Sequence, residues 1–167
     1  MKIEFLLNGK PISQDISPEK KLLHFLRDDM LMTGTKCGCD NGDCGVCSVL
    51  LDGKLVKSCL LPVSEVNGRK VTTIEGIHDE VDGPNDLQQS MLNHGAIQCG
   101  FCTPAMVMAG EALLLRNPSP NREEIRAGIN SVLCRCTGYQ QIIDAIEETA
   151  IKRQASLLKK EHDREGA

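Results

Sequence analysis

Aromatic side chains are the scarcest feature of this 167-residue sequence, which has no tryptophan, one tyrosine and three phenylalanines. Proteins that stack on nucleic-acid bases need such side chains. The net charge of −4 also leaves no excess of lysine and arginine for binding phosphates. No apolar run approaches the roughly 20 residues that cross a bilayer. The sequence therefore indicates neither a nucleic-acid partner nor a membrane span.

The N-terminus lacks the pattern of an export signal, because Glu4 interrupts its only apolar stretch and no small-residue cleavage site follows. The nine cysteines make up about 5% of the chain, below the roughly 8–10% that marks a disulfide scaffold. Their odd number and the missing signal favour reduced thiols in the cytoplasm. Reduced cysteines that occur in groups usually hold metal.

The first half of the chain alternates apolar and polar residues and is predicted to form a small mixed sheet with a helix across one face. Asn8-Gly9 and Asp52-Gly53 are two-residue hairpin signals between strands. Ser17 is the expected N-cap of the helix, with Pro18 at its first position and an end near Met30. The strands are expected at 3–7, 12–16, 46–51, 54–58 and 71–74.

Beyond residue 76 the periodicity becomes helical, and four helices are predicted after an acidic stretch punctuated by Gly and Pro. Their expected ranges are 86–94, 103–117, 121–129 and 139–150. Asn121 and Glu124 have the spacing of a capping box. The predicted divisions are a sheet domain at 1–76, a linker at 77–85, a helical domain at 86–153 and a charged tail at 154–167. We expect this tail to be a frayed helix end followed by disorder.

One group of cysteines has the C-x4-C-x2-C spacing, with a fourth cysteine 12 positions on, that plant-type ferredoxins use for a 2Fe–2S cluster. Its members are Cys39, Cys44, Cys47 and Cys59. Gly38, Gly42 and Gly45 let the backbone between them approach the sulfurs. Cys37 breaks this spacing and is predicted to be a spare thiol. Zinc is the alternative metal, although its four-thiolate sites usually contain two C-x2–4-C pairs and this group has one.

A second group of cysteines combines a C-x2-C pair with a C-x-C pair in the helical half. Its members are Cys99, Cys102, Cys134 and Cys136. Each pair comes before a predicted helix start, where free N–H groups and the helix dipole favour thiolates. A C-x-C pair is tight for zinc and compatible with two thiolates on a 2Fe–2S cluster.

The residues around these cysteines resemble a known family, the small iron–sulfur subunits of the molybdenum hydroxylases. This superfamily includes xanthine dehydrogenase, aldehyde oxidoreductase and carbon monoxide dehydrogenase. The resemblance is carried by QCGFCTP at 98–104, CRCTGY at 134–139 and GCDNGDCGVC at 38–47, and it spans about residues 1–152. It implies an α+β fold, in which an N-terminal β-grasp ferredoxin domain is followed by a four-helix domain, each with a 2Fe–2S cluster.

The resemblance further implies an electron-transfer subunit that has no catalytic residue of its own. Electrons would pass singly from a molybdenum–pyranopterin centre on a large partner subunit, through the two clusters, to FAD on a medium partner subunit. Gln98 and Cys136 correspond to residues that contact the pterin in relatives. The amide of Gln98 offers both a donor and an acceptor to a pterin edge.

Two positions depart from the pattern of the family. Ala105 stands where relatives commonly have Gly, and Ser131-Val132-Leu133 stands where they commonly have Gly-Asn-Leu. Val132 removes a hydrogen-bonding side chain beside the predicted second cluster, which makes the support of that loop a question for the structure. Two other functions stay open: a free-standing ferredoxin-like electron shuttle and a zinc-stabilised interaction module.

Overall fold

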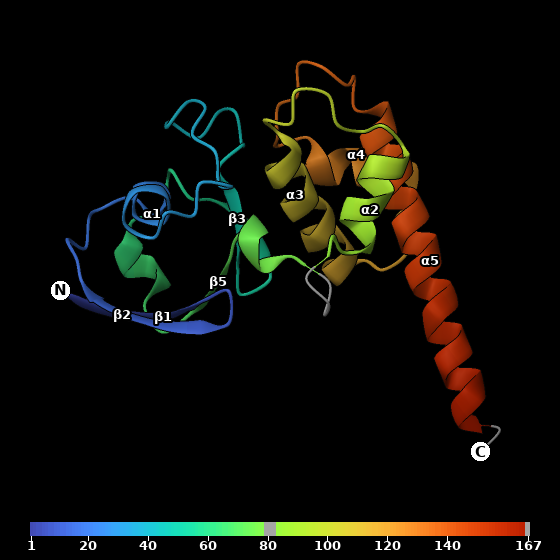
Figure 1. Cartoon of the computed structure of the whole chain (residues 1–167), viewed down its shortest axis with the longest axis horizontal. Helices are drawn as coiled ribbons and strands as arrows, with labels where there is room; N and C mark the ends of the chain where they lie inside the picture. The colour runs from blue at the N-terminus through green and yellow to red at the C-terminus, as the bar shows by residue number, and fades with distance from the viewer. Residues whose placement is uncertain (79–82, 166–167) are drawn as a thin grey trace.

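A computed structural model describes residues 1–78 and 83–165 of the chain (Figure 1). Residues 79–82 of the predicted linker and the last two residues of the predicted tail lie outside the described residues. A sheet with short helices lies beside a group of longer helices, which is the α+β arrangement expected. No helix in the described part of the chain is both long enough and apolar enough to cross a membrane.

The sheet has five strands in the order β2-β1-β5-β3-β4. β1 and β5 are parallel, whereas β1 pairs with β2, and β3 with both β4 and β5, in antiparallel fashion. Both predicted hairpin turns are confirmed, since Asn8 and Asp52 have φ of 50° and the glycine after each also has a positive φ. The strands are β1 (Lys2–Leu7), β2 (Lys10–Asp15), β3 (Ser48–Leu51), β4 (Lys54–Lys57) and β5 (Lys70–Thr72).

The helix that packs on this sheet starts later than predicted. It consists of α1 (Leu22–His24) and the π-helical η1 (Phe25–Asp29), so the prediction of Ser17 as N-cap with a proline at the first helical position is wrong. The N-cap position is taken by Lys21, whose backbone forms an isolated β-bridge with Pro62. This long-range pairing holds the residues before the helix in an extended conformation, which overrides the local capping signal.

The helical half contains the four predicted helices. The capping box of Asn121 and Glu124 is confirmed, and Asn85 and Gln88 form a second one at the start of the first helix. Two short 3-10 helices, η2 (Val63–Val66) and η3 (Ile74–Gly76), lie earlier in the chain. The four long helices are α2 (Asp86–Asn93), α3 (Thr103–Arg116), α4 (Arg122–Ile129) and α5 (Gln140–Glu165).

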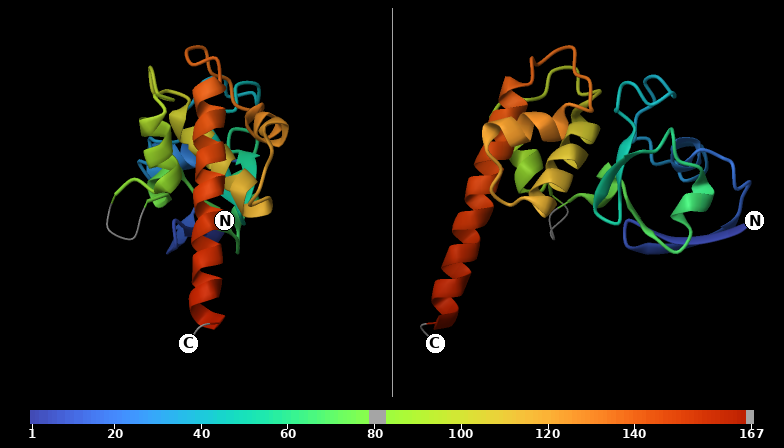
Figure 2. Two further views of the ribbon diagram at one scale, coloured as in Figure 1. Left: turned by 90° about the vertical axis from the view of Figure 1, so that its right-hand side faces the viewer. Right: turned by 180° about the vertical axis from the view of Figure 1, so that it is seen from behind.

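The last helix is much longer than predicted. α5 continues to Glu165 and projects beyond the other helices (Figure 2), so the expectation of a frayed helix end followed by disorder in the tail at 154–167 is wrong for 154–165. The sequence of α5 contains no glycine or proline, and most of its residues have high helix propensity.

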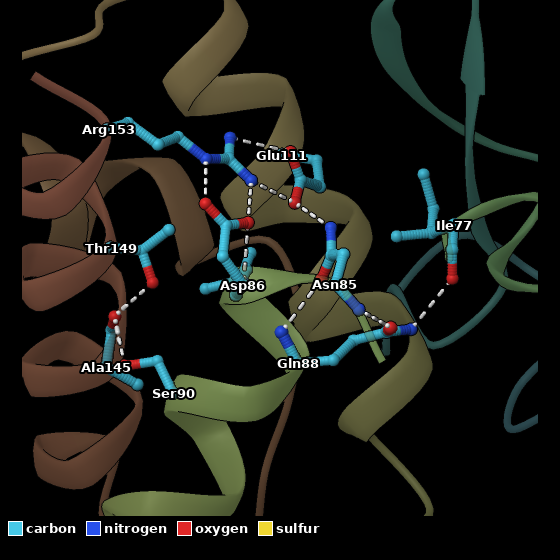
Figure 3. Close-up of polar contacts among 10 residues, drawn as sticks. Ile77, Asn85, Asp86, Gln88, Ser90, Glu111, Ala145, Thr149 and Arg153 are labelled. Carbon is cyan, nitrogen blue, oxygen red and sulfur yellow. Dashed lines mark hydrogen bonds and ion pairs between the residues drawn. The ribbon is translucent and has the colours of Figure 1, made fainter. Parts of the chain in front are cut away.

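Arg153 also anchors α5 to two other helices (Figure 3). Its guanidinium donates to both carboxylate oxygens of Asp86, at 2.8 and 2.6 Å, and to both oxygens of Glu111, at 3.0 and 2.8 Å. Glu111 is buried, so it needs such a partner to stay charged. Gln88 donates to the carbonyl of Ile77 at 3.1 Å. Together these bonds fix the end of the sheet domain and α5 relative to α2 and α3.

The two halves of the chain meet at the first cysteine loop. The backbone N–H of Leu133 donates to the carbonyl of Cys44 at 2.8 Å. The neighbouring Gly45, with φ of +70°, is so close to the helical half that an added Cβ would lie 1.9 Å from the carbonyl oxygen of Ser131. Val46 is buried in the same core as the residues of α2 to α5. The loop is therefore a packed part of both domains.

Substitution of Gly45 tests this close approach. Gly45→Ala should destabilise the protein by roughly 2–5 kcal/mol, because it combines a left-handed alanine with a clash against backbone. Gly53→Ala is the matched control, since Gly53 has φ of +79° but nothing within 4 Å of an added Cβ, and it should cost only about 1–2 kcal/mol. Urea unfolding of both variants measures the difference. Equal losses would show that the contact with Ser131 contributes nothing.

Candidate metal centres

The first group of cysteines lies on the irregular loop before β3 and on the turn after β4. Cys39 and Cys44 lie on the loop, Cys47 directly precedes β3, and Cys59 comes two residues after β4 ends. The loop folds tightly, since a Cβ added at Gly38 would lie 2.8 Å from the sulfur of Cys44. Only glycine leaves room for the backbone there.

The four thiols of this group contact one another in two pairs. Cys39 lies beside Cys44, and Cys47 lies beside Cys59. The second pair is buried against Leu23. A 2Fe–2S cluster with four cysteines takes two thiolates on each iron, so this two-and-two arrangement fits such a cluster.

Backbone amides surround the sulfur of Cys39. The N–H of Cys44 donates to this sulfur at 3.4 Å. This bond and those from the N–H groups of Asn41 and Asp43 lower the pKa of the Cys39 thiol to about 6. At Cys59, in contrast, burial and the neighbouring sulfur of Cys47 raise the pKa to about 12. A metal ion would offset that cost, because coordination deprotonates a thiol outright.

The second group of cysteines lies on two loops of the helical half. Cys99 and Cys102 precede α3, and Cys102 is its N-cap residue. Cys134 and Cys136 lie between α4 and α5. These thiols also form two pairs, since Cys102 contacts Cys134 and Cys136 contacts Cys99. In Figure 1 these loops and the loop of the first group lie at the same, upper end of the molecule.

Burial distinguishes the two pairs of this second group. Cys102 is buried, and burial together with the nearby Cys134 raises its pKa to about 12. Burial also acts to raise the pKa of Cys134, but hydrogen bonds, first of all with the hydroxyl of Thr137 at 3.1 Å, lower it overall. Cys99 and Cys136 are exposed. One pair therefore faces the core of the helical domain and the other faces outward.

Tyr139 supports the loop of Cys134, a role that sequence reasoning did not assign to it. Its hydroxyl accepts a hydrogen bond from the backbone N–H of Cys134 at 2.8 Å and donates to the carbonyl of Val132 at 3.4 Å. Its φ of +67° is rare for a non-glycine residue. The sequence contains one indication of this role, because the only tyrosine of the chain directly follows Gly138 and lies close to the C-x-C pair.

The two departures from the family pattern are both packed in the helical core. Val132 and Ala105 are buried there among other apolar residues. Valine has no side-chain group that can form a hydrogen bond. The backbone carbonyl of Val132 nevertheless has a partner, because it accepts a hydrogen bond from the hydroxyl of Tyr139. Valine therefore contributes apolar packing, while the tyrosine supplies the polar support.

Three predicted positions of interest are exposed. Gln98 is exposed and directly precedes Cys99 in the chain. Cys136 is also exposed, and its thiol contacts the thiol of Cys99. Cys37 is exposed as well and belongs to none of the four pairs. Within residues 1–78 and 83–165, no three His, Cys, Asp or Glu side chains are gathered as the ligands of a single metal ion would be. The arrangement is one of thiol pairs.

Comparisons with known proteins agree with the division into two halves. A family described as a 2Fe-2S iron-sulfur cluster binding domain matches residues 5–72, and one described as a [2Fe-2S] binding domain matches residues 73–147. The nicotine 6-hydroxylase small subunit of Paenarthrobacter nicotinovorans is 40% identical over 146 residues, which cover 87% of each chain. The nicotinate dehydrogenase small FeS subunit of Eubacterium barkeri is 41% identical over 155 residues, covering 92% of this chain and 97% of that one.

A solved structure shows the same fold. The crystal structure of quinoline 2-oxidoreductase from Pseudomonas putida 86 contains a chain that is 41% identical to this one. The two superpose with a TM-score of 0.87, covering 93% of this chain and 96% of that chain. The likeness therefore extends over both halves and over their relative placement.

Serine substitutions test which thiols of the first loop bind metal. Cys39→Ser should reduce the iron content from about four to about two per chain, because one of two clusters loses a ligand. Cys37→Ser is the matched control and should leave about four. Iron analysis of the purified variants gives the answer. The opposite pattern would place the ligand two residues earlier in the loop.

Proposed function

We propose that this chain relays single electrons between two partner subunits, because it belongs to the family of small 2Fe–2S subunits of the molybdenum hydroxylases. In this proposal the electrons come from a molybdenum–pyranopterin centre on a large subunit, and they leave to FAD on a medium subunit. The chain itself contributes no catalytic residue and turns over no substrate alone.

Each group of four cysteines is proposed to hold one 2Fe–2S cluster, which supplies reversible one-electron reduction when bound. The ligands would be Cys39, Cys44, Cys47 and Cys59 in the β-grasp domain, and Cys99, Cys102, Cys134 and Cys136 in the helical domain. The contacts of these thiols in pairs support the assignment. Their chemistry supports it too, since all eight are unbonded sulfurs and thiolates are the usual ligands of such clusters.

The observation that best supports the proposed relay is the hydrogen bond from the N–H of Leu133 to the carbonyl of Cys44. Cys44 and Cys134 are proposed ligands of different clusters. The backbone between them consists of the Cys44 carbonyl, this 2.8 Å bond and the single residue Leu133. Two carriers that exchange electrons need such a short and fixed connection, whereas two independent modules on one chain do not.

The exposed face around Cys99 and Cys136 is proposed to dock on the molybdenum subunit. Phe101 and Leu133 lie close to these thiols in sequence, and their large apolar side chains are 47% and 54% exposed, so apolar surface lies beside the thiols for a partner to cover. Gln98 is exposed there as well. In the proposed complex, Gln98 and Cys136 would contact the pterin. This apolar face favours a permanent subunit over a free-standing shuttle.

Two further parts of the proposal concern the metal and the compartment. A visible absorption spectrum of the protein purified without air tests the metal, because iron–sulfur clusters are coloured and zinc sites are not. The odd number of cysteines and their grouping as proposed cluster ligands fit a reducing compartment. We therefore propose that the chain works in the cytoplasm.

Replacing Cys44 with serine tests the relay. In the assembled complex, the variant should still allow substrate to reduce molybdenum in a single turnover. Reduction of FAD should slow by roughly tenfold or more, because the β-grasp cluster has lost a ligand. Stopped-flow absorbance, with paramagnetic resonance of the molybdenum and cluster signals, measures both steps.

Cys37→Ser serves as the control for this experiment, since it makes the same chemical change outside both groups of thiols. It should reduce FAD at the wild-type rate. If the Cys44→Ser variant also keeps that rate, the β-grasp cluster is not on the electron path. It would then only stabilise its domain, and the proposed relay would be wrong.

A further inference from the structure

Two lysines from outside the first cysteine loop hold backbone carbonyls within it. The ammonium group of Lys21, next to α1, donates to the carbonyl oxygen of Asp40 at 2.8 Å. The ammonium group of Lys57, at the end of β4, donates to the carbonyl oxygen of Gly42 at 2.5 Å. Both lysines are partly buried, so these bonds are shielded from water on one side.

The same two peptide groups point their other ends at Cys39. A peptide unit shares one plane, and its C=O and N–H point in opposite directions when it is trans, as all described peptides here are. The carbonyl of Asp40 belongs to the peptide whose N–H is that of Asn41, and the carbonyl of Gly42 belongs to the peptide whose N–H is that of Asp43. These two N–H groups are among those that lower the pKa of the Cys39 thiol, although the N–H of Asp43 also donates to the side-chain oxygen of Asn41 at 3.3 Å.

We propose that Lys21 and Lys57 are positioning residues that raise the reduction potential of the β-grasp cluster by orienting these two peptide dipoles toward the Cys39 sulfur. The inference rests on the proposed function, in which Cys39 is a ligand of that cluster. Reduction adds negative charge to the cluster, and hydrogen bonds to its sulfurs stabilise that charge. A cation on the carbonyl end holds each peptide in place and strengthens its N–H as a donor.

At Lys21, the neighbouring charges help to separate this mechanism from a plain effect of positive charge. Lys21 also forms an ion pair with the carboxylate of Asp40, at 2.9 Å. His24 approaches the same carboxylate at 3.3 Å. The positive charge of Lys21 is thus largely balanced beside the loop. Its effect on the cluster should act mainly through the carbonyl that it holds, and this difference can be measured.

Reduction potentials of the assembled complex provide the test. In Lys21→Met or Lys57→Met, the one-electron equilibrium of the β-grasp cluster should shift about threefold toward the oxidised form, which corresponds to about 28 mV. The double variant should shift about tenfold, or about 59 mV. Redox titration followed by paramagnetic resonance resolves the two clusters, and the helical-domain cluster of the same sample should keep its potential.

Four control variants make the result specific. Lys20→Met removes a neighbouring lysine that pairs with Asp29 and does not touch the loop, so it should leave the potential unchanged. Lys21→Arg and Lys57→Arg keep a cationic donor and should restore most of the wild-type value. Lys21→Met combined with Asp40→Asn leaves the net charge as it was, and its potential should still fall because the carbonyl has lost its donor.

The outcomes separate this inference from the proposed function. Full iron content with an unchanged potential in both methionine variants would overturn the inference and leave the relay intact. An equal fall in Lys20→Met, or full recovery in the charge-balanced variant, would overturn it in favour of a simple charge effect. If a methionine variant loses iron, the lysine is needed to hold the cluster rather than to set its potential, and the inference is overturned for that residue. A wild-type complex with fewer than four irons per chain would instead contradict the proposed function.

Discussion

The hydrogen bond from the N–H of Leu133 to the carbonyl of Cys44 is the contact on which the arrangement of the two domains depends. It joins the loops that carry the two groups of cysteines, and it forms only because Gly45 has no side chain to strike the backbone of Ser131. Both loops are irregular, and this bond ties their backbones to each other. Packing of Val46 into the helical core and the hydrogen bond from Gln88 to the carbonyl of Ile77 maintain the same placement from other sides.

Each candidate site combines thiols that ionise readily with thiols that resist ionisation. At Cys39, backbone N–H groups lower the pKa, whereas burial raises the pKa of Cys59 and Cys102 to about 12. A cluster bound by these thiols would have backbone N–H groups near some of its sulfurs and buried apolar side chains near the others. Both features are means by which a protein sets a reduction potential. At Cys134 the sulfur contacts the hydroxyl of Thr137 at 3.1 Å, and the backbone N–H donates to the hydroxyl of Tyr139 at 2.8 Å.

Local sequence signals predicted most of the fold and both groups of thiols. Cysteine spacing, the Asn-Gly and Asp-Gly turns and the capping box at Asn121 all act over a few residues, and the turns and the cap are confirmed. The errors arose where distant residues decide. Pairing with Pro62 delays the start of α1, and Arg153 extends the anchored part of α5. The roles of Tyr139, Lys21 and Lys57 depend on contacts that no spacing rule contains.

The central claim is that one chain holds two 2Fe–2S clusters and passes electrons between partner subunits. Metal and sulfide analysis of the complex purified without air, together with paramagnetic resonance after reduction, tests it most directly. The account predicts about four irons and four sulfides per copy of this chain and two distinct cluster signals. About two irons per chain with a single signal, or zinc in stoichiometric amount, would contradict it.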